Sequence, residues 1–491
     1  MKKIIFSLFL ITTVISVAVA QDWVALKKNQ WQNEGVPPTK GLGGNSISEL
    51  IVQEFDDSTI VWAGTGSGLS RLNVDDDQWY TYSEPQGLGY GSLSALTIRD
   101  NEIWLATFYD SLFASAGSQY LGGGISFSKD GGQTWNHVKQ PSETKIPGQN
   151  VTWDIALIDS TVWLASWSGG VRRSDDQGQT WNVVTPDGFI LDPVTNLNHN
   201  AWAILNADGV LWMGTAGGVN KSVDKGNTWV NYTHQNQDKP ISGNWARQLA
   251  HQKYDDKSVI WAACWIASSE DEDPTEYNAV CKSEDQGYTW ECFLEGERAF
   301  GFAFDGPVVY VTAENGLFKS VDGGASWAHY PPIKDVENDL AVYTEEYYSA
   351  AVESNSTLWV GTTDGLARTS NDGLTWKIYR AFNPSGVNGE PRTYAFPNPF
   401  SPMRANNIDG DGHVRLQYNV KSAATVTIKI YDFALDHVVT VVNGKSRMPG
   451  DYHEVWDGKN ERREQVANGV YHYSVEISGD GTYWGKIIVL D

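Results

Sequence analysis

The chain repeats one pattern of apolar and polar positions seven times. Each repeat opens with three apolar residues that include a Trp or Tyr, passes through a glycine-rich turn into a second short segment, and ends in a polar turn that closes with Trp. Apolar runs of this length between such turns favour β-strands over helices. The opening segments are Ile60-Val61-Trp62, Ile103-Trp104-Leu105, Val162-Trp163-Leu164, Leu211-Trp212-Met213, Ile260-Trp261-Ala262, Val309-Tyr310-Val311 and Leu358-Trp359-Val360.

The polar turns share the pattern Ser-x-Asp-x-Gly-x-Thr-Trp, and we call them aspartate turns. Asp can accept hydrogen bonds from its own turn, Gly tolerates a positive φ, and Trp can pack between neighbouring sheets. The seventh turn has Asn at the Asp position, and the first, at Asp75 to Trp79, has lost most of the pattern. We expect a structural role for Asp130, Trp135, Asp176, Trp181, Asp224, Trp229, Asp285, Trp290, Asp322, Trp327, Asn371 and Trp376.

The spacing of the repeats predicts the fold. The closing tryptophans at 79, 135, 181, 229, 290, 327 and 376 lie on average about 49 residues apart, which suits a four-stranded propeller blade with its loops. The sequence therefore predicts an all-β chain: a seven-bladed β-propeller over residues 21–382, a linker over 383–394, and a small antiparallel, Ig-like β-sandwich over 395–491. A strand from Trp23 to Glu34 is expected to close the ring.

The aspartate turns resemble the Asp-boxes, or BNR repeats, of sialidases, sortilin-type receptors, xyloglucan-cleaving hydrolases and photosystem assembly-factor propellers. The segments Gly44 to Ser48 and Gly91 to Ser94 also resemble repeats of two-component-regulator propellers. In Asp-box proteins the turn lies between the two outer strands of a blade, on the face opposite the ligand site. The resemblance therefore implies a fold and leaves the activity open.

The last hundred residues alternate polar and apolar positions in five short segments, as in a β-sandwich. They resemble FlgD-type immunoglobulin-like modules and the sorting domains of type IX secretion cargo, through Pro397-Asn398-Pro399-Phe400, Trp456-Asp457-Gly458 and Gly469 to Tyr473. The turn Ala434-Leu435-Asp436 departs from that pattern, which usually has a Gly there. The resemblance implies export through outer-membrane secretion machinery, with possible removal of the tail on surface attachment. A purely structural sandwich is the alternative.

The N-terminus and the charge bear on location. Residues 1–20 combine Lys2 and Lys3, an apolar run and Ala18-Val19-Ala20, as a secretory signal peptide does. No later apolar stretch is long enough to cross a membrane, so we expect a mature chain without a transmembrane segment, secreted or on the outer surface of a Gram-negative-type bacterium. The net charge of −24 makes nucleic acid a poor partner.

The three cysteines leave two alternatives. Cys281 and Cys292 flank a predicted hairpin turn and can form a disulfide, or all three, with Cys264, are buried thiols. No metal-ligand spacing is present, so we expect neither a metal nor a cofactor. The acidic run Glu270 to Asp273 and the segment Asn407 to Gly412 fit a solvated loop and a hairpin turn better than calcium loops.

Ligands of propellers bind at the mouth where the innermost strands begin. Counting back from the aromatic residue of each second strand places Trp153, Trp202 and Phe300 there, with Trp245 as the equivalent in blade five. Asp154, Arg247 and Arg298 lie beside them. Aromatic faces with a few charged groups suit sugar rings or peptide side chains, although packing between blades is the alternative. Insertions at Tyr109 to Gly122 and Trp265 to Tyr277 are expected on the same face.

These features predict a non-catalytic propeller that binds protein or polysaccharide. The alternative is a glycoside hydrolase of sialidase-like or xyloglucanase-like type. Retaining or inverting hydrolysis needs two carboxyl groups about 5 to 10 Å apart, whereas resemblance to a sialidase implies a Tyr nucleophile with a Glu, an acid/base Asp and three arginines. The sequence shows no arginine triad, nucleophile elbow, phosphate loop or HExxH helix. No residue is therefore assigned a catalytic role.

Overall fold

The computed structural model describes residues 36–56, 58–113, 117–141, 150–267, 273–383, 385, 390–403 and 412–490. The predicted signal peptide and the Trp23 to Glu34 strand lie outside the described residues. Apart from two short 3₁₀ helices, η1 (Glu84–Gln86) and η2 (Leu197–His199), the described elements are all β-strands. The chain forms two compact units: a propeller unit of Met1–Tyr330 with Tyr347–Lys377, and a sandwich unit of Pro331–Glu346 with Ile378–Asp491.

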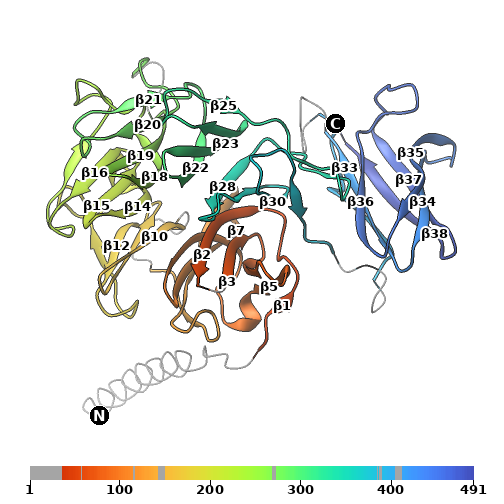
Figure 1. Ribbon diagram of the computed structural model, residues 1–491, viewed down its shortest axis with the longest axis horizontal. Coiled ribbons are helices and arrows are strands. Elements are labelled where there is room, and N and C mark those ends of the chain that lie inside the picture. Colours follow the sequence, from red (N-terminus) through yellow and green to blue (C-terminus); the bar gives the residue numbers. More distant parts are fainter. Residues whose placement is uncertain are drawn as a thin grey trace, which may run out of the picture. The chain divides into compact units, whose positions relative to one another are not determined.

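Seven antiparallel sheets succeed one another in the propeller unit, and Figure 1 shows them in chain order from red to teal. The first strand of each sheet contacts that of the next, and the last contacts the first, so these strands form the inner ring. The fold is therefore a seven-bladed β-propeller, as predicted. The inner strands are β2 (Ile47–Phe55), β6 (Ser92–Arg99), β10 (Thr152–Ile158), β14 (Ala201–Ala207), β18 (Trp245–Tyr254), β22 (Ala299–Asp305) and β28 (Tyr347–Val352).

The remaining strands of each blade follow outward from the inner ring. The second strands are β3 (Ser58–Thr65), β7 (Glu102–Phe113), β11 (Thr161–Ser166), β15 (Val210–Thr215), β19 (Lys257–Trp265), β23 (Val308–Ala313) and β29 (Leu358–Thr362). The third strands are β4 (Gly68–Asn73), β8 (Gly117–Ser128), β12 (Gly170–Ser174), β16 (Gly218–Ser222), β20 (Ala279–Ser283), β24 (Gly316–Ser320) and β30 (Gly365–Thr369). The fourth strands are β5 (Gln78–Tyr82), β9 (Asn136–Val138), β13 (Asn182–Val184), β17 (Val230–Tyr232), β21 (Glu291–Phe293), β25 (Ala328–His329) and β31 (Lys377–Tyr379).

Among the described residues, the ring closes between the first and last blades without exchange of strands. The first blade instead gains a fifth strand, β1 (Thr39–Lys40), on its outer edge beside β5. Hydrogen bonds join the two blades, from Gly365 N to Asn45 O (2.6 Å) and from Ser349 Oγ to Ile47 O (3.4 Å). Closure within the described residues therefore rests on side-by-side packing of whole blades.

The aspartate turns connect the third and fourth strands of the blades. In the second blade, Asp130 Oδ1 accepts hydrogen bonds from Thr134 N (2.9 Å) and Ser128 Oγ (2.7 Å), while Thr134 Oγ1 donates to Oδ2 (2.6 Å). Asn371 in the seventh blade reproduces the bond from the backbone N–H of Thr375 (2.9 Å). These local bonds replace the water that an exposed turn would bind.

The closing tryptophan of a turn packs against the second-strand tryptophan of the preceding blade. Trp135 lies in one apolar cluster with Trp62, and Trp327 meets Trp261 edge-on at 6.3 Å. Gly226 has a φ of +84°, and a Cβ there would lie 2.5 Å from Trp163 Cη2. Each turn thus fastens its own hairpin and a neighbouring blade, so the repeated residues are explained by blade packing.

The sandwich unit contains two sheets that enclose one core. One sheet holds β32 (Thr393–Phe396), β33 (Val414–Val420) and β36 (Gly450–Trp456), and the other holds β35 (His437–Arg447), β34 (Ala424–Tyr431), β37 (Gly469–Ile477) and β38 (Gly481–Val489). Leu416 and Trp456 from the first sheet pack with Ile428 and Tyr473 from the second. Leu435, at the turn that departs from the usual glycine, has a φ of +66°, so the backbone conformation that glycine favours is kept.

The sandwich unit also includes a hairpin that precedes the last blade in the sequence. Its strands are β26 (Lys334–Asp335) and β27 (Leu340–Ala341). Asp339 forms ion pairs with Arg447 (3.0 Å) and Lys445, and the buried Asp335 accepts a hydrogen bond from Ile378 N (3.0 Å). The unit thus takes in residues 331–346 and begins again at Ile378, whereas the sequence predicts that residues 331–346 and 378–382 belong to the propeller.

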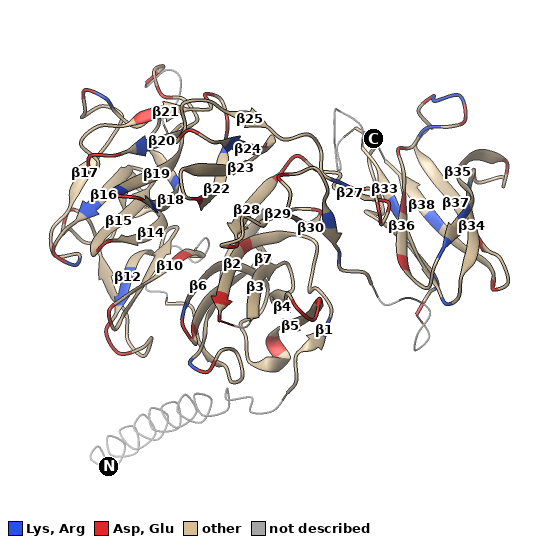
Figure 2. Cartoon of the chain, viewed as in Figure 1, with Lys and Arg blue, Asp and Glu red and all other residues tan. Residues whose placement is uncertain are grey.

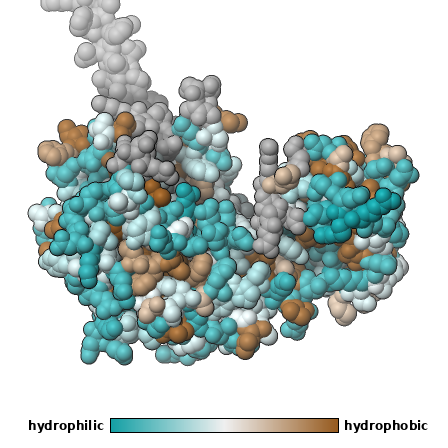
Figure 3. Space-filling view, turned by 90° about the horizontal axis from the view of Figure 1, so that it is seen from above, coloured by the Kyte–Doolittle hydropathy of each residue, from teal (hydrophilic) through white to brown (hydrophobic). Residues whose placement is uncertain are grey.

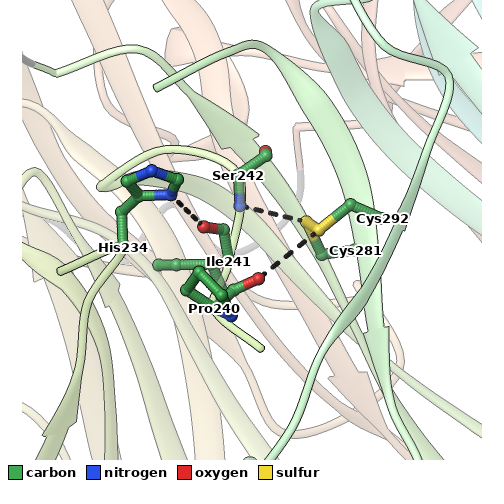
Figure 4. The surroundings of a disulfide bond; sticks show 6 residues. All are labelled: His234, Pro240, Ile241, Ser242, Cys281 and Cys292. Carbon is green, nitrogen blue, oxygen red and sulfur yellow. Dashed lines mark hydrogen bonds between the residues drawn. A yellow bond between two sulfur atoms is a disulfide. The ribbon is translucent and has the colours of Figure 1, made fainter. Parts of the chain in front are cut away.

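Cys281 and Cys292 are opposite each other on β20 and β21 and form a disulfide, with their Cα atoms 4.0 Å apart. Figure 4 shows the connection from blade four lying over this bridge, where Ser242 N is 3.3 Å from Cys281 Sγ. Cys264 is a buried free thiol, and burial raises its pKa to about 12. The structure thus decides between the two alternatives that the sequence left open.

Candidate ligand-binding mouth

Each of the seven inner strands carries a β-bulge at the same place, near its first residue. The pairing with the second strand skips one residue there, and a bulge of this kind turns the skipped side chain away from the regular pleat. Since all seven lie where the inner strands begin, they form a ring at one end of the central channel, which we call the mouth. The bulge residues are Ser48, Ser94, Trp153, Trp202, Arg247, Phe300 and Tyr348.

The bulges correct the expected alignment of the fifth blade. Arg247, not Trp245, occupies the position of Trp153 and Trp202, because the register shift lies between Ala246 and Gln248. Trp245 is two residues earlier and pairs with Trp265 at the end of β19. The count from the second-strand aromatic failed because β18 and β19 are longer than the corresponding strands of their neighbours.

Four tryptophans and Arg247 gather at the mouth over blades three to five, and we call them the mouth cluster. The ring of Trp202 lies 5.5 Å from that of Trp153, 4.7 Å from Trp167 and 6.2 Å from Trp245. All four rings are half-buried. The indole N–H groups of Trp153, Trp202 and Trp245 find no hydrogen-bond acceptor among the described residues. These rings therefore contact one another across blades, and their residues remain partly exposed.

Arg247 is held at the mouth by aromatic rings. Its guanidinium carbon lies 4.7 Å from the ring centre of Trp202 and 5.4 Å from that of Trp153, within the range of cation–π attraction. Within the described part of the chain, no hydrogen bond or ion pair forms to this guanidinium. Its N–H donors are therefore oriented but not used.

Two carboxyl groups share the channel with Arg247. Burial, and to a lesser extent the charge of Asp154, raises the pKa of Glu49 to about 8, while Arg247 acts to lower it. Burial raises the pKa of Asp154 to about 7 against the opposing effect of hydrogen bonds from Ile204 N (2.9 Å) and Ile155 N (2.8 Å). Asp154 therefore ties blade three to blade four, whereas Glu49 accepts no hydrogen bond from the described residues.

Glu49 was missed in the sequence, although a signal for it exists. Glu49 follows the bulge residue Ser48 as Asp154 follows Trp153, so aligning the inner strands by their bulge places both acids at one level. The apolar opening segments, on which the repeat was aligned, lie in the second strands and do not fix this register. Burial also lowers the pKa of Arg247, so all three charged groups are poorly solvated.

Phe300 and Arg298 belong to a second aromatic group, on blades five to seven. Phe300 contacts Trp265 (5.6 Å) and Tyr348 (4.9 Å), both edge-on. The exposed Arg298 places its guanidinium carbon 5.6 Å from the ring centre of Trp265. The predicted site residues thus fall into two groups, with Trp153, Asp154, Trp202, Trp245 and Arg247 together.

The two insertions extend from the ends of the second strands, on the mouth side of their blades. In blade two, Tyr109 pairs with Leu121 beyond the first inner-strand pair, Ser92 with Phe108, so the β7–β8 hairpin projects past the blade. Residues 268–272 of the blade-five insertion, including Glu270, Asp271 and Glu272, lie outside the described residues. Glu276 anchors the described remainder by accepting hydrogen bonds from Asn244 Nδ2 (2.6 Å) and Ala267 N (2.7 Å).

The β7–β8 hairpin borders a pocket of about 470 Å³ between blades one and two. Tyr90 and Tyr109 meet edge-on at 5.4 Å on its wall, and Phe108 lines it as well. Glu84 and Asp110 add carboxylates. Phe108 also contacts Trp153 (5.6 Å), so the pocket adjoins the mouth cluster.

Charged and apolar residues are interspersed in the views of Figures 2 and 3. Figure 2 shows acidic and basic residues interspersed along the strands and turns, and in Figure 3 the apolar residues form separate groups among hydrophilic ones. Among the described residues, no group of three or more His, Cys, Asp or Glu is placed to hold a metal ion. In the same ranges, no helix has the length and hydropathy needed to cross a bilayer.

The fold and its tail define an all-β protein made of a β-propeller and an FlgD Ig-like domain, whose family model matches residues 403–481. No curated protein sequence matches the chain. The GH74 enzyme of Niastella koreensis is similar in structure, with a TM-score of 0.53 at 13% identity over 93% of this chain and 74% of that chain. An ancestral GH74 enzyme gives 0.47 at 14% identity over 93% and 63%. YCF48 from Cyanidioschyzon merolae gives 0.43 at 12% identity over 71% and 98%.

At 13% identity, the similarity to the GH74 enzyme of Niastella koreensis bears on the fold of the chain and not on its chemistry. The match of the tail to an FlgD Ig-like domain agrees with its two-sheet sandwich.

Proposed function

We propose that this protein is a non-catalytic binding propeller, secreted or held on the outer surface of a Gram-negative-type bacterium, whose mouth cluster holds a polysaccharide or protein ligand. The observation that carries the proposal is the free guanidinium of Arg247, stacked on Trp153 and Trp202. A donor group fixed beside exposed aromatic faces suits a ligand that offers both apolar faces and hydrogen-bond acceptors.

We further propose that the aspartate turns are Asp-boxes with a structural role, and that the C-terminal domain serves export through outer-membrane secretion machinery. The match of residues 403–481 to an FlgD Ig-like domain and the signal-like residues 1–20 support export. A secretion assay can compare the full chain with a fusion protein that carries residues 378–491 but lacks residues 331–346. The comparison tests whether the C-terminal segment alone suffices for export. Retention of the full chain inside the cell would contradict the export role.

A glycoside hydrolase is the second candidate, because two carboxyl groups with raised pKa values lie in one channel. Hydrolysis uses a pair of carboxyl groups, one of which is protonated at the working pH. Glu49 can be the protonated group, because its pKa is raised to about 8. Asp154 fits the role of its partner less well, since two backbone N–H groups already hold its carboxylate.

A glycan and peptide array probed with the full chain separates these functions. Binding is expected on polysaccharide or peptide spots, and Trp202→Ala is expected to weaken it about tenfold, or ~1.4 kcal/mol. Tyr288→Ala is the matched control, because Tyr288 is an exposed aromatic residue in an aspartate turn. Release of new reducing ends from a bound polysaccharide, lost in Glu49→Gln, would establish the hydrolase instead.

A further inference from the structure

The pocket on blades one and two and the mouth cluster are joined by one side chain. Phe108 lines the pocket, and its ring lies 5.6 Å from that of Trp153. From Trp153 the rings continue to Trp202 at 5.5 Å and then to Trp245 at 6.2 Å. Aromatic rings therefore follow one another at nearly constant spacing across four consecutive blades.

The pocket differs from the mouth in its polar groups. Its lining includes Ser67, Ser92, Glu84 and Asp110, and no basic residue among those that the structure describes. A ligand with its own negative charge would be repelled there. A ligand rich in neutral hydroxyls can donate to these carboxylates and accept from Arg247, whose N–H groups are free.

We infer that the ligand is an extended neutral polysaccharide, bound from the mouth cluster across Phe108 into the pocket between blades one and two. This rests on the proposed binding function and adds its ligand class and its length. Sugar rings present flat apolar faces that can pack on aromatic side chains, and hydroxyls at their edges that can form hydrogen bonds. The aromatic and polar residues of the mouth cluster and the pocket can therefore contact both parts of a sugar ring. The projecting β7–β8 hairpin forms the wall of the distal part of the site, through Tyr109.

The inference is tested by the dependence of affinity on chain length. Disaccharides and hexasaccharides of β-1,4-glucan, β-1,4-mannan and β-1,4-xylan are titrated into the full chain by calorimetry, with oligogalacturonate as an anionic probe. At least one neutral hexasaccharide is expected to bind ten times or more as tightly as its disaccharide, and oligogalacturonate at least tenfold more weakly than that hexasaccharide.

Variants divide the site into its two parts. Tyr90 is 62% exposed, so Tyr90→Ala should fold normally, and Tyr109→Ala removes its partner. Both are expected to remove the gain from chain length while leaving disaccharide affinity unchanged, whereas Trp202→Ala weakens both ligands. Tyr288→Ala is the control, and melting temperatures verify folding.

The outcomes separate the inference from the function on which it rests. Equal affinity for short and long oligosaccharides, no effect of Tyr90→Ala and Tyr109→Ala, or tighter binding of oligogalacturonate would overturn the extended neutral site and leave binding at the mouth intact. Binding of a peptide but of no sugar would overturn the ligand class. Absence of binding to sugars and peptides alike would overturn the proposed function as well.

Discussion

The guanidinium carbon of Arg247 lies 4.7 Å from the centre of the Trp202 ring, one blade away. This contact links the bulges of two neighbouring inner strands, and Trp153 extends it to a third. Because aromatic rings rather than carboxylates hold the arginine, its orientation is fixed while its donors stay available. The positive charge of the same arginine acts to lower the pKa of both Glu49 and Asp154.

Arg247→Met is expected to raise the pKa of Glu49 above its present value of about 8, since Arg247 is the group that lowers it. The pKa can be followed by carboxyl-selective NMR between pH 5 and 10. Arg298→Met is the control, because that exposed arginine is not among the charges that act on Glu49. An unchanged titration in Arg247→Met would show that the two groups are not coupled.

Glu49→Gln is expected to stabilise the protein at alkaline pH. The pKa of Glu49 is raised on folding, so its contribution to stability is greatest below pH 4.5 and is lost as pH rises toward 8. The variant lacks this loss and should exceed the wild type by about 1–3 kcal/mol at pH 9, an amount reduced by solvent in the channel. Chemical denaturation at pH 5 and pH 9 measures the difference, and equal curves at both would contradict the prediction.

Asp130→Ala removes the acceptor of three hydrogen bonds in the second aspartate turn. We expect a loss of about 1 kcal/mol and a fall of about 2–4 °C in melting temperature. Asp75→Ala is the control, because the carboxylate of Asp75 receives no hydrogen bond from the described residues. If both variants melt alike, the aspartate of the turn contributes nothing to stability.

Acid should weaken the intact turns together. Hydrogen bonds from Thr180 lower the pKa of Asp176 to about 2, and Thr228 does the same for Asp224. Lowered pKa values stabilise the fold above the unfolded pKa of about 4 and lose that effect as pH falls toward 2. Calorimetric melting from pH 5 to pH 2 should show this loss, with a smaller decrease in a variant that carries Asn at both positions.

Removing the disulfide by Cys281→Ser with Cys292→Ser should cost about 2–3 kcal/mol, as expected for a short closed loop. Denaturation of the oxidised wild type, the reduced wild type and the double variant checks this, and the last two should agree. Cys264 stays unreactive toward thiol reagents in the folded protein, because it is buried and its pKa is about 12. Rapid labelling of Cys264 without denaturant would contradict its burial.

The propeller could be predicted from the sequence because the same residue types recur in successive blades, where they pack one blade against the next. Trp62 and Trp135 illustrate this: the recurring aromatic positions of two blades meet in one cluster. The site was predicted less well, because the bulges that set its register have no fixed residue type, ranging from Ser48 to Trp202 to Arg247. Glu49 and Trp167 contribute through three-dimensional proximity, which repeat spacing does not encode.

The hairpin around Asp339 makes the sandwich unit discontinuous in sequence, because residues 331–346 belong to it and the last blade separates them from the remainder. Ile333 and Val342 of this segment are buried. Lys445 and Arg447 contact the carboxylate of Asp339 although they lie 106 and 108 positions later in the sequence, beyond the last blade. A single peptide-bond cleavage within residues 383–394 would therefore not free the C-terminal piece, since strands β26 and β27 would keep hold of it. Maturation that discards the tail needs a second event, such as unfolding or a second cut.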